Sequence, residues 1–178
     1  MIRLLNLLLL LTALNSFAQE AIKPRPSPLA FVTLRYKDTY IKIIYSQPHK
    51  KGREIFGHVV PYGAIWRTGA NEATEITSTK DMMVNSTVLK AGTYSIFTIP
   101  EKDSWTIIIN SELGLWGSYN YNSKFDVLRF QLPVQLLQDV VYEPFTITID
   151  QKNDKAEIAL LWANVKVSFP IQFIEIKP

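Results

Sequence analysis

The chain has 178 residues, 47% of them hydrophobic, and a formal net charge of +3. This length suits one domain with a full hydrophobic core, and a net charge so small and dispersed excludes a nucleic-acid-binding surface. The sequence contains no cysteine, which excludes a disulfide framework, thiol catalysis and thiolate metal sites, so a packed core has to provide the stability.

The first residues have the pattern of a secretory signal peptide. Arg3 supplies the positive charge, residues 4–14 form the apolar run, and Ser16-Phe17-Ala18 is a small-residue cleavage site. The apolar run is shorter than the ~20 residues that a membrane-spanning helix needs. Residues 1–18 are therefore predicted to be a signal peptide. The product is expected to be soluble, periplasmic or secreted, and without a membrane anchor.

The remaining chain reads as a short tether followed by strands. Residues 19–28 contain three prolines and are predicted to form an extended tether. Residues 29–178 are predicted to form a single all-β domain, either an antiparallel β-sandwich or a flattened barrel, because they lack a long amphipathic helix. Strands are predicted in residues 31–36, 40–46, 75–80, 82–84, 87–89, 93–99, 105–110, 126–132, 145–149, 158–162 and 165–169, and the alternation of polar and apolar residues is cleanest in the last three.

Three details of this pattern lead to specific expectations. Asn85-Ser86 is predicted to be the turn of a tight hairpin. Residues 134–141 fit either a helical turn or the edge of a sheet. Trp162 continues the clean alternation of Ile158 and Leu160, so its ring is expected to be buried between two sheets.

The stretch from Gly52 to Thr74 does not alternate. Four glycines and a proline interrupt it, so it is predicted to be a loop around one short helical turn near Gly52–Val60. Loops that carry charged and aromatic side chains on a frame of strands are the usual location of functional sites. The sequence therefore places the candidate site in this loop, with residues 114–124 as a second irregular stretch.

Arg67, Asn71 and Glu72 lie beside Trp66 in this loop. One interpretation is a ligand site: a guanidinium that binds a carboxylate, phosphate or sugar hydroxyl, an amide and a carboxylate that hydrogen-bond, and a ring that stacks. The alternative is structural, with Arg67 paired to Glu72 or Glu75 and Trp66 filling the core. Both interpretations stay open from the sequence alone.

Aromatic side chains extend the candidate set. Tyr94, Trp116 and Tyr119 suit stacking on a sugar ring, and the alternative is that Trp116 and Tyr119 cover a sheet edge. The predicted ligand-binding residues are Arg53, Trp66, Arg67, Asn71, Glu72, Tyr94 and Trp116.

No recognised catalytic set is found in the sequence. Glu72 and Glu75 are three residues apart, which puts them on opposite faces of a strand rather than facing each other as glycosidase carboxylates do. His49 and His58 lack the spacing of a metal-binding pair, and neither a nucleophile elbow nor a phosphate-binding glycine loop occurs. We therefore expect no metal and no cofactor, and the sequence assigns no catalytic residue.

Three strings of residues resemble one protein family: G-R-E-I-F-G at residues 52–57, P-Y-G-A-I-W-R-T-G-A-N-E-A-T at residues 61–74 and L-K-A-G-T-Y-S-I-F-T-I-P at residues 89–100. With shorter matches elsewhere, the chain resembles, from about residue 40 to residue 171, a family of exported bacterial proteins catalogued only as a domain of unknown function. The resemblance implies export and a single compact domain, and it implies no substrate.

Together these observations predict an exported, non-catalytic binding module whose Gly52–Thr74 loop takes an anionic or sugar-like ligand, a small molecule or a glycan rather than nucleic acid. One alternative is an enzyme of unfamiliar type, with Glu72 as acid or base and Arg67 holding an anionic group. The other is a purely structural envelope protein. The oligomeric state stays open.

Overall fold

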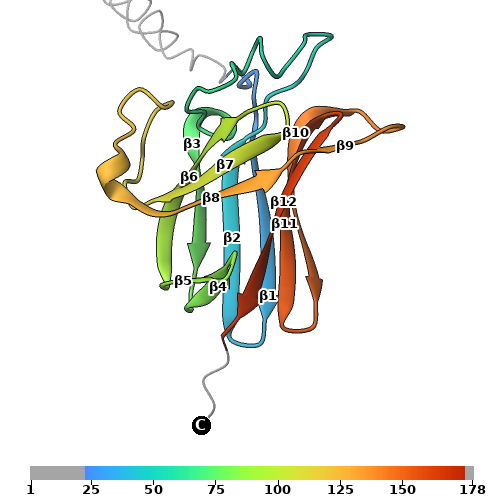
Figure 1. Ribbon diagram of the computed structural model, residues 1–178. Coiled ribbons are helices and arrows are strands. Elements are labelled where there is room, and N and C mark those ends of the chain that lie inside the picture. Colours follow the sequence, from blue (N-terminus) through green and yellow to red (C-terminus); the bar gives the residue numbers. More distant parts are fainter. Residues whose placement is uncertain (1–22, 175–178) are drawn as a thin grey trace, which may run out of the picture.

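The computed structural model describes residues 23–174, which form two antiparallel β-sheets packed face to face (Figure 1). The predicted signal peptide, residues 1–18, lies outside this range. Within the described residues, no helix is long and apolar enough to cross a membrane. The all-β prediction is confirmed, and the two open sheets make the fold a sandwich rather than a closed barrel.

The first sheet has the strand order β1-β2-β3-β6-β7-β8, and the second has the order β10-β11-β12-β4-β5, with β9 paired to β12. At one end the chain after β2 joins the sheets, because Phe145 N donates to Pro48 O (2.8 Å) and Lys50 N donates to Glu143 O (2.7 Å). The strands are β1 (Leu29–Tyr36), β2 (Thr39–Ser46), β3 (Ala70–Ser78), β4 (Met82–Val84), β5 (Thr87–Leu89), β6 (Gly92–Pro100), β7 (Ser104–Asn110), β8 (Asp126–Pro133), β9 (Gln135–Leu136), β10 (Tyr142–Lys152), β11 (Lys155–Ala163) and β12 (Val165–Phe173).

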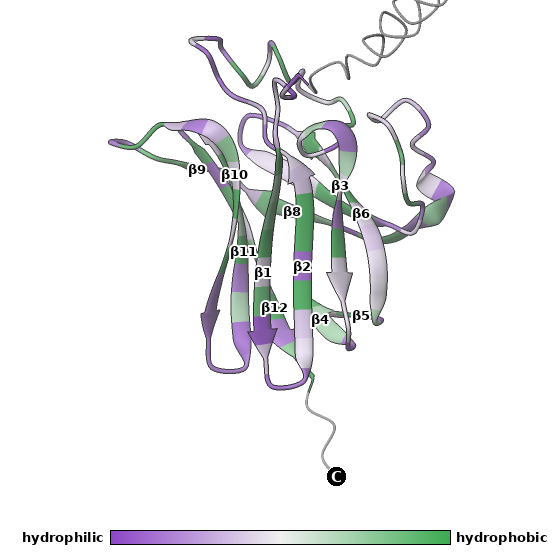
Figure 2. Cartoon of the chain, turned by 180° about the vertical axis from the view of Figure 1, so that it is seen from behind, coloured by the Kyte–Doolittle hydropathy of each residue, from purple (hydrophilic) through white to green (hydrophobic). Residues whose placement is uncertain are grey.

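Local chemistry explains most of these strands. The β4–β5 hairpin turns at Asn85 and Ser86, both with positive φ (44° and 69°), which is the geometry that two-residue hairpins require. Neither alternative holds for all of residues 134–141: Gln135 and Leu136 form β9, which pairs with Lys166 and Val165 of β12, and residues 137–141 lie in neither a helix nor a strand. The turns between β1 and β2 and between β10 and β11 are hydrophilic and lie at the same end of the molecule (Figure 2).

The short helical turn predicted near Gly52–Val60 is wrong. This segment forms tight turns instead, in which His58 N donates to Ile55 O (3.3 Å) and Gly57 N donates to Val60 O (2.8 Å). Gly57 has φ +90°, a conformation outside the right-handed helical region, and Pro61 follows. Within the described residues, the one short helix is the 3₁₀ helix η1 (Ser123–Phe125).

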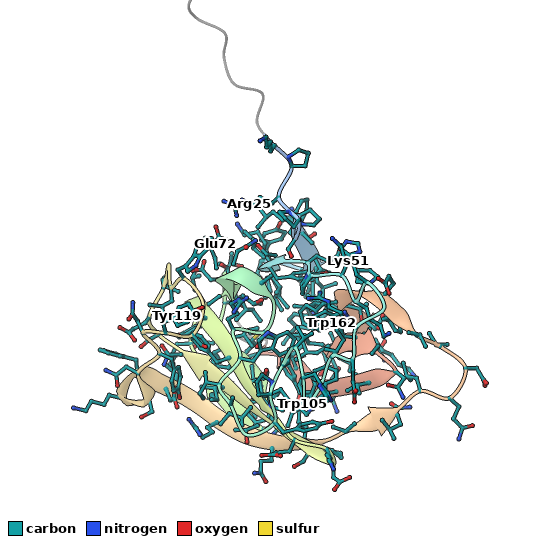
Figure 3. All side chains as sticks on the ribbon, turned by 90° about the horizontal axis from the view of Figure 1, so that it is seen from above. Arg25, Lys51, Glu72, Trp105, Tyr119 and Trp162 are labelled. Atoms are coloured by element: carbon teal, nitrogen blue, oxygen red, sulfur yellow. The ribbon has the colours of Figure 1, made fainter. Side chains whose placement is uncertain are left out.

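The core between the sheets is built around an aromatic cluster. The ring of Trp66 stacks on Trp162 with centroids 5.8 Å apart, and it meets Trp105 at 5.9 Å and Phe145 at 5.1 Å edge-on. Figure 3 shows Trp105 and Trp162 in the middle of the molecule when it is viewed from the loop end. Trp162 is 2% exposed, so its predicted burial is confirmed.

Candidate functional site

The site residues project from an irregularity in β3. The pairing of β2 with β3 passes from Ile44–Glu75 to Ser46–Ala70, so residues 71–74 form an enlarged bulge opposite Tyr45. Asn71 begins the bulge with φ +55°, a left-handed conformation that asparagine adopts more readily than most residues. The asparagine at position 71 therefore suits the backbone conformation that the bulge requires.

Two loops interlock over this bulge. Ala73 N donates to Leu115 O (2.9 Å), and Ser118 Oγ donates to Ile65 O (3.1 Å), which joins the chain before β3 to the loop between β7 and β8. A second, small apolar cluster around Phe97 lies beneath them. Phe97 follows Ile96 of the main core in sequence, so it faces the opposite side of the sheet. The interlocked loops thus cover the part of the outer face of the first sheet around Phe97 and Ile108.

Arg67 lies at this interlock. Its neighbour Trp66 pairs with Thr98 of β6 and points into the core. The Arg67 side chain is partly buried, and its Nε is fully buried with no hydrogen-bond partner among the described residues. Burial lowers the pKa of Arg67, and the nearby Tyr119 hydroxyl acts in the opposite direction. Within residues 23–174 no carboxylate pairs with this guanidinium.

The partner of Glu72 is Arg25. Arg25 Nη1 donates to both carboxylate oxygens of Glu72, at 2.8 Å and 3.1 Å, and Ser46 Oγ donates to Oε2 at 3.3 Å. Glu75 Oε1 accepts a hydrogen bond from Gly114 N at 3.0 Å. The predicted structural alternative, in which Arg67 pairs with Glu72 or Glu75, is therefore wrong.

Arg25 belongs to the stretch predicted to be an extended tether. The described part of that stretch lies against the end of the first sheet, where Gln47 N donates to Pro28 O (2.8 Å) and Asn71 Nδ2 donates to Ser27 O (3.4 Å). Figure 3 shows Arg25 and Glu72 on the same side of the molecule. Residues 25–28 are thus attached to the bulge.

The Arg25–Glu72 contact should be visible as a titration. The pKa of Glu72 is lowered chiefly by its own backbone N–H, and then by Arg25 and Ser46, against the opposing effect of burial. The contact therefore stabilises the fold above the ordinary pKa of glutamate and is lost as the pH falls through the lowered value. We expect carbon-13 NMR to show a lowered pKa for Glu72 and Arg25→Ala to raise it only part of the way. An unchanged pKa in Arg25→Ala would contradict the contact.

Two exposed rings belong to the interlocked loop between β7 and β8. The backbone of Trp116 pairs with that of Glu72, and Tyr119 lies close enough to Arg67 to affect its pKa. Trp116 is 58% exposed and Tyr119 is 84% exposed. Gly117 between them has φ +69°, and a Cβ there would lie 2.7 Å from Cε2 of Tyr119, so only glycine lets the Tyr119 ring lie against the backbone. Gly117 N also donates to Asn71 O (2.9 Å), which ties both rings to the bulge.

The structure divides the predicted ligand-binding residues. Arg67, Asn71, Glu72 and Trp116 come together at the interlock. Tyr119 joins them: the sequence suggested it for stacking on a sugar ring, although it is not among the predicted ligand-binding residues. We call Arg67, Asn71, Glu72, Trp116 and Tyr119 the Arg67 surface.

Three predicted residues lie elsewhere. Trp66 is in the core, where its indole N–H donates to Gly69 O (3.0 Å), so the interpretation that it fills the core is the correct one. Tyr94 lies four residues before Thr98 on β6, roughly 13 Å along the strand, and its hydroxyl donates to Lys90 O. Arg53 lines a separate cavity at the loop end.

The described residues contain no group of three or more His, Asp or Glu side chains that could hold a metal ion. His58 Nε2 lies 3.1 Å from Glu54 on the surface. Between Glu72 and Glu75 there is a shallow groove of about 260 Å³, which Leu29 and Gly114 also line. Because Glu72 and Glu75 are both engaged in hydrogen bonds, the groove has no free carboxylate pair.

Comparison with known proteins places the chain in a family. No curated protein and no solved structure matches it. The model of the family described as "Protein of unknown function (DUF2911)" matches residues 27–171, a range that contains the whole Arg67 surface. As the three motif strings indicated, the chain belongs to this DUF2911 family.

Proposed function

We propose that this chain is a non-catalytic binding domain that recognises an acidic sugar at the Arg67 surface. The observation that carries the proposal is the partly buried guanidinium of Arg67, which has no counter-charge within the described residues. Burying a cation without a partner is costly, and a bound anion offsets that cost. Guanidinium has five N–H donors in a planar fork, which suits a carboxylate or phosphate on the sugar.

The rings of Trp116 and Tyr119 support the sugar part of the proposal. An exposed aromatic face on a fixed backbone offers an apolar platform for a sugar ring at low entropic cost. Both rings stand on a loop that is hydrogen-bonded to the bulge at Asn71 and Ala73 and to the chain before β3 at Ile65. Export, which the first 18 residues predict, would place such a domain among envelope glycans.

The enzyme alternative has less support. A general acid at neutral pH needs a raised pKa, whereas the pKa of Glu72 is lowered. Its carboxylate is engaged by Arg25 and Ser46 and not directed at Arg67. This arrangement favours binding over an acid–base reaction.

Calorimetric titration with a short oligogalacturonide, compared with a neutral oligosaccharide of equal length, tests the proposal. We expect the acidic sugar to bind and the neutral one to bind more weakly. Trp116→Ala and Tyr119→Ala should each weaken binding about 2- to 10-fold, the scale of one aromatic contact.

The matched control is Tyr40→Ala, since Tyr40 is another exposed ring, at the hairpin end of β2, and its removal should not change the affinity. Equal affinity for the two sugars, or ring variants that behave like the control, would contradict the proposal.

A further inference from the structure

A cavity of about 400 Å³ lies at the loop end of the sandwich, between the two sheets. Its walls are the turns of residues 50–62, the β6–β7 turn at Glu101 and Lys102, Leu136 of β9, and Asn164 between β11 and β12. Figure 3 looks down on this end, with Trp105 and Lys51 labelled. The cavity shares none of its lining residues with the Arg67 surface.

The floor of the cavity is formed by apolar side chains. Phe56 and Trp105 meet edge-on with ring centroids 4.9 Å apart, and Ile55 and Val165 are buried beside them. These side chains belong to the main core, so the floor is held by the packing of both sheets. A cavity of about 400 Å³ with an apolar floor is within the range of cavities that bind small organic molecules.

The rim carries three cations: Lys50, Arg53 and Lys102. The guanidinium of Arg53 is held in place, because Nε donates to Lys50 O (3.1 Å) and Nη2 donates to His49 O (2.7 Å). Within residues 23–174, neither Lys50 nor Lys102 forms an ion pair.

Two carboxylates also line the cavity. The carboxylate of Glu54 lies 3.1 Å from His58 Nε2. The second carboxylate, that of Glu101, forms no ion pair among the described residues. Three cations against two carboxylates leave the rim with a formal charge of +1. Positive groups around an apolar floor are complementary to a molecule with a negative head and an apolar body.

We infer that this cavity is a second binding site, which takes a small organic anion such as an aromatic or branched carboxylate or sulfonate. The apolar body would lie on Phe56 and Trp105, and the negative group would face Lys50, Arg53 and Lys102. This site is independent of the acidic-sugar site, because the two surfaces use different residues and different loops.

The probe for the test is 8-anilinonaphthalene-1-sulfonate, an aromatic sulfonate whose fluorescence rises in apolar surroundings. We expect saturable binding of one probe molecule per folded chain. The double variant Lys50→Gln/Lys102→Gln should weaken it about 5- to 10-fold, the scale of two partly exposed ion pairs. Thermal melting of each variant should stay close to that of the parent chain, because both lysines extend from turns on the surface.

The charge-matched control is Lys152→Gln/Lys155→Gln, at the β10–β11 turn and roughly 25 Å away along β10. It removes the same charge and should leave probe binding unchanged, as should Arg67→Met. Non-saturable binding, or equal effects of the two lysine pairs, would overturn the inference. Loss of probe binding in Arg67→Met alone would likewise overturn it, by placing the probe at the Arg67 surface.

Discussion

Replacing Trp162 with alanine should lower the free energy of unfolding by about 3–5 kcal/mol, the usual cost of removing a large buried aromatic side chain. The ring stacks on Trp66, meets Phe145 at 5.9 Å and is 2% exposed, so its removal leaves a cavity that both sheets line. The substitution also removes the indole N–H that donates to Glu143 O (3.2 Å). Urea unfolding followed by circular dichroism measures the change.

Trp116→Ala is the matched control for this experiment. It removes the same side chain from an exposed position, so it should change the free energy of unfolding by no more than about 0.5 kcal/mol. A loss below about 1 kcal/mol for Trp162→Ala, or equal losses for the two tryptophans, would contradict the central place of Trp162 in the core.

Arg67→Met should weaken binding of the acidic sugar about 10- to 100-fold and leave the stability nearly unchanged. Methionine keeps much of the packing of the arginine stem and removes all five donors, so the charged hydrogen bonds to the ligand, about 1.5–3 kcal/mol, are lost. The fold should tolerate the change, because the buried Nε of Arg67 has no partner among the described residues to leave behind. Calorimetric titration and thermal melting measure the two effects.

The double variant Arg67→Met/Glu72→Gln separates a binding role from a structural one. Because Glu72 is held by Arg25 and Ser46, its substitution should not change the effect of Arg67→Met on stability. Arg35→Met on β1 removes an exposed guanidinium elsewhere and should leave binding intact. A loss of about 3–5 kcal/mol in Arg67→Met that Glu72→Gln restores would instead mean that the two residues form a buried pair.

Much of the fold could be predicted because strand patterns are local. Ile41, Ile43 and Tyr45 occupy alternate positions of one strand, and in the structure they lie on the buried face of β2. The hairpin at Asn85-Ser86 follows from residues that tolerate positive φ. By contrast, the helical turn predicted near Gly52–Val60 is wrong. The spacing of the glycines does not show that Gly57 adopts a positive φ, which a right-handed helical turn does not allow.

The candidate site was predicted only in part. Arg67, Asn71 and Glu72 are neighbours in sequence, so their common location needed no long-range information. The partner of Glu72 did, since Arg25 is 47 positions away. Trp66 points into the core, whereas the adjacent Arg67 is only partly buried. The residue types in this loop do not show which of its side chains face the core.

The amino-acid sequence by itself determined the all-β class, most of the strands, the inward face of Trp162 and the family to which the chain belongs. These properties depend on the alternation of side chains along a strand and on short sequence motifs, and both are set by residues close together in the sequence. Only the tertiary structure decided that Arg25 binds Glu72 and that Arg67 lacks a counter-charge within the described residues. It also decided that the loop between β7 and β8 places Trp116 beside Glu72 and Tyr119 near Arg67. The physical reason is that these contacts join segments far apart in sequence, and the register between such segments is set by the packing of the whole sandwich.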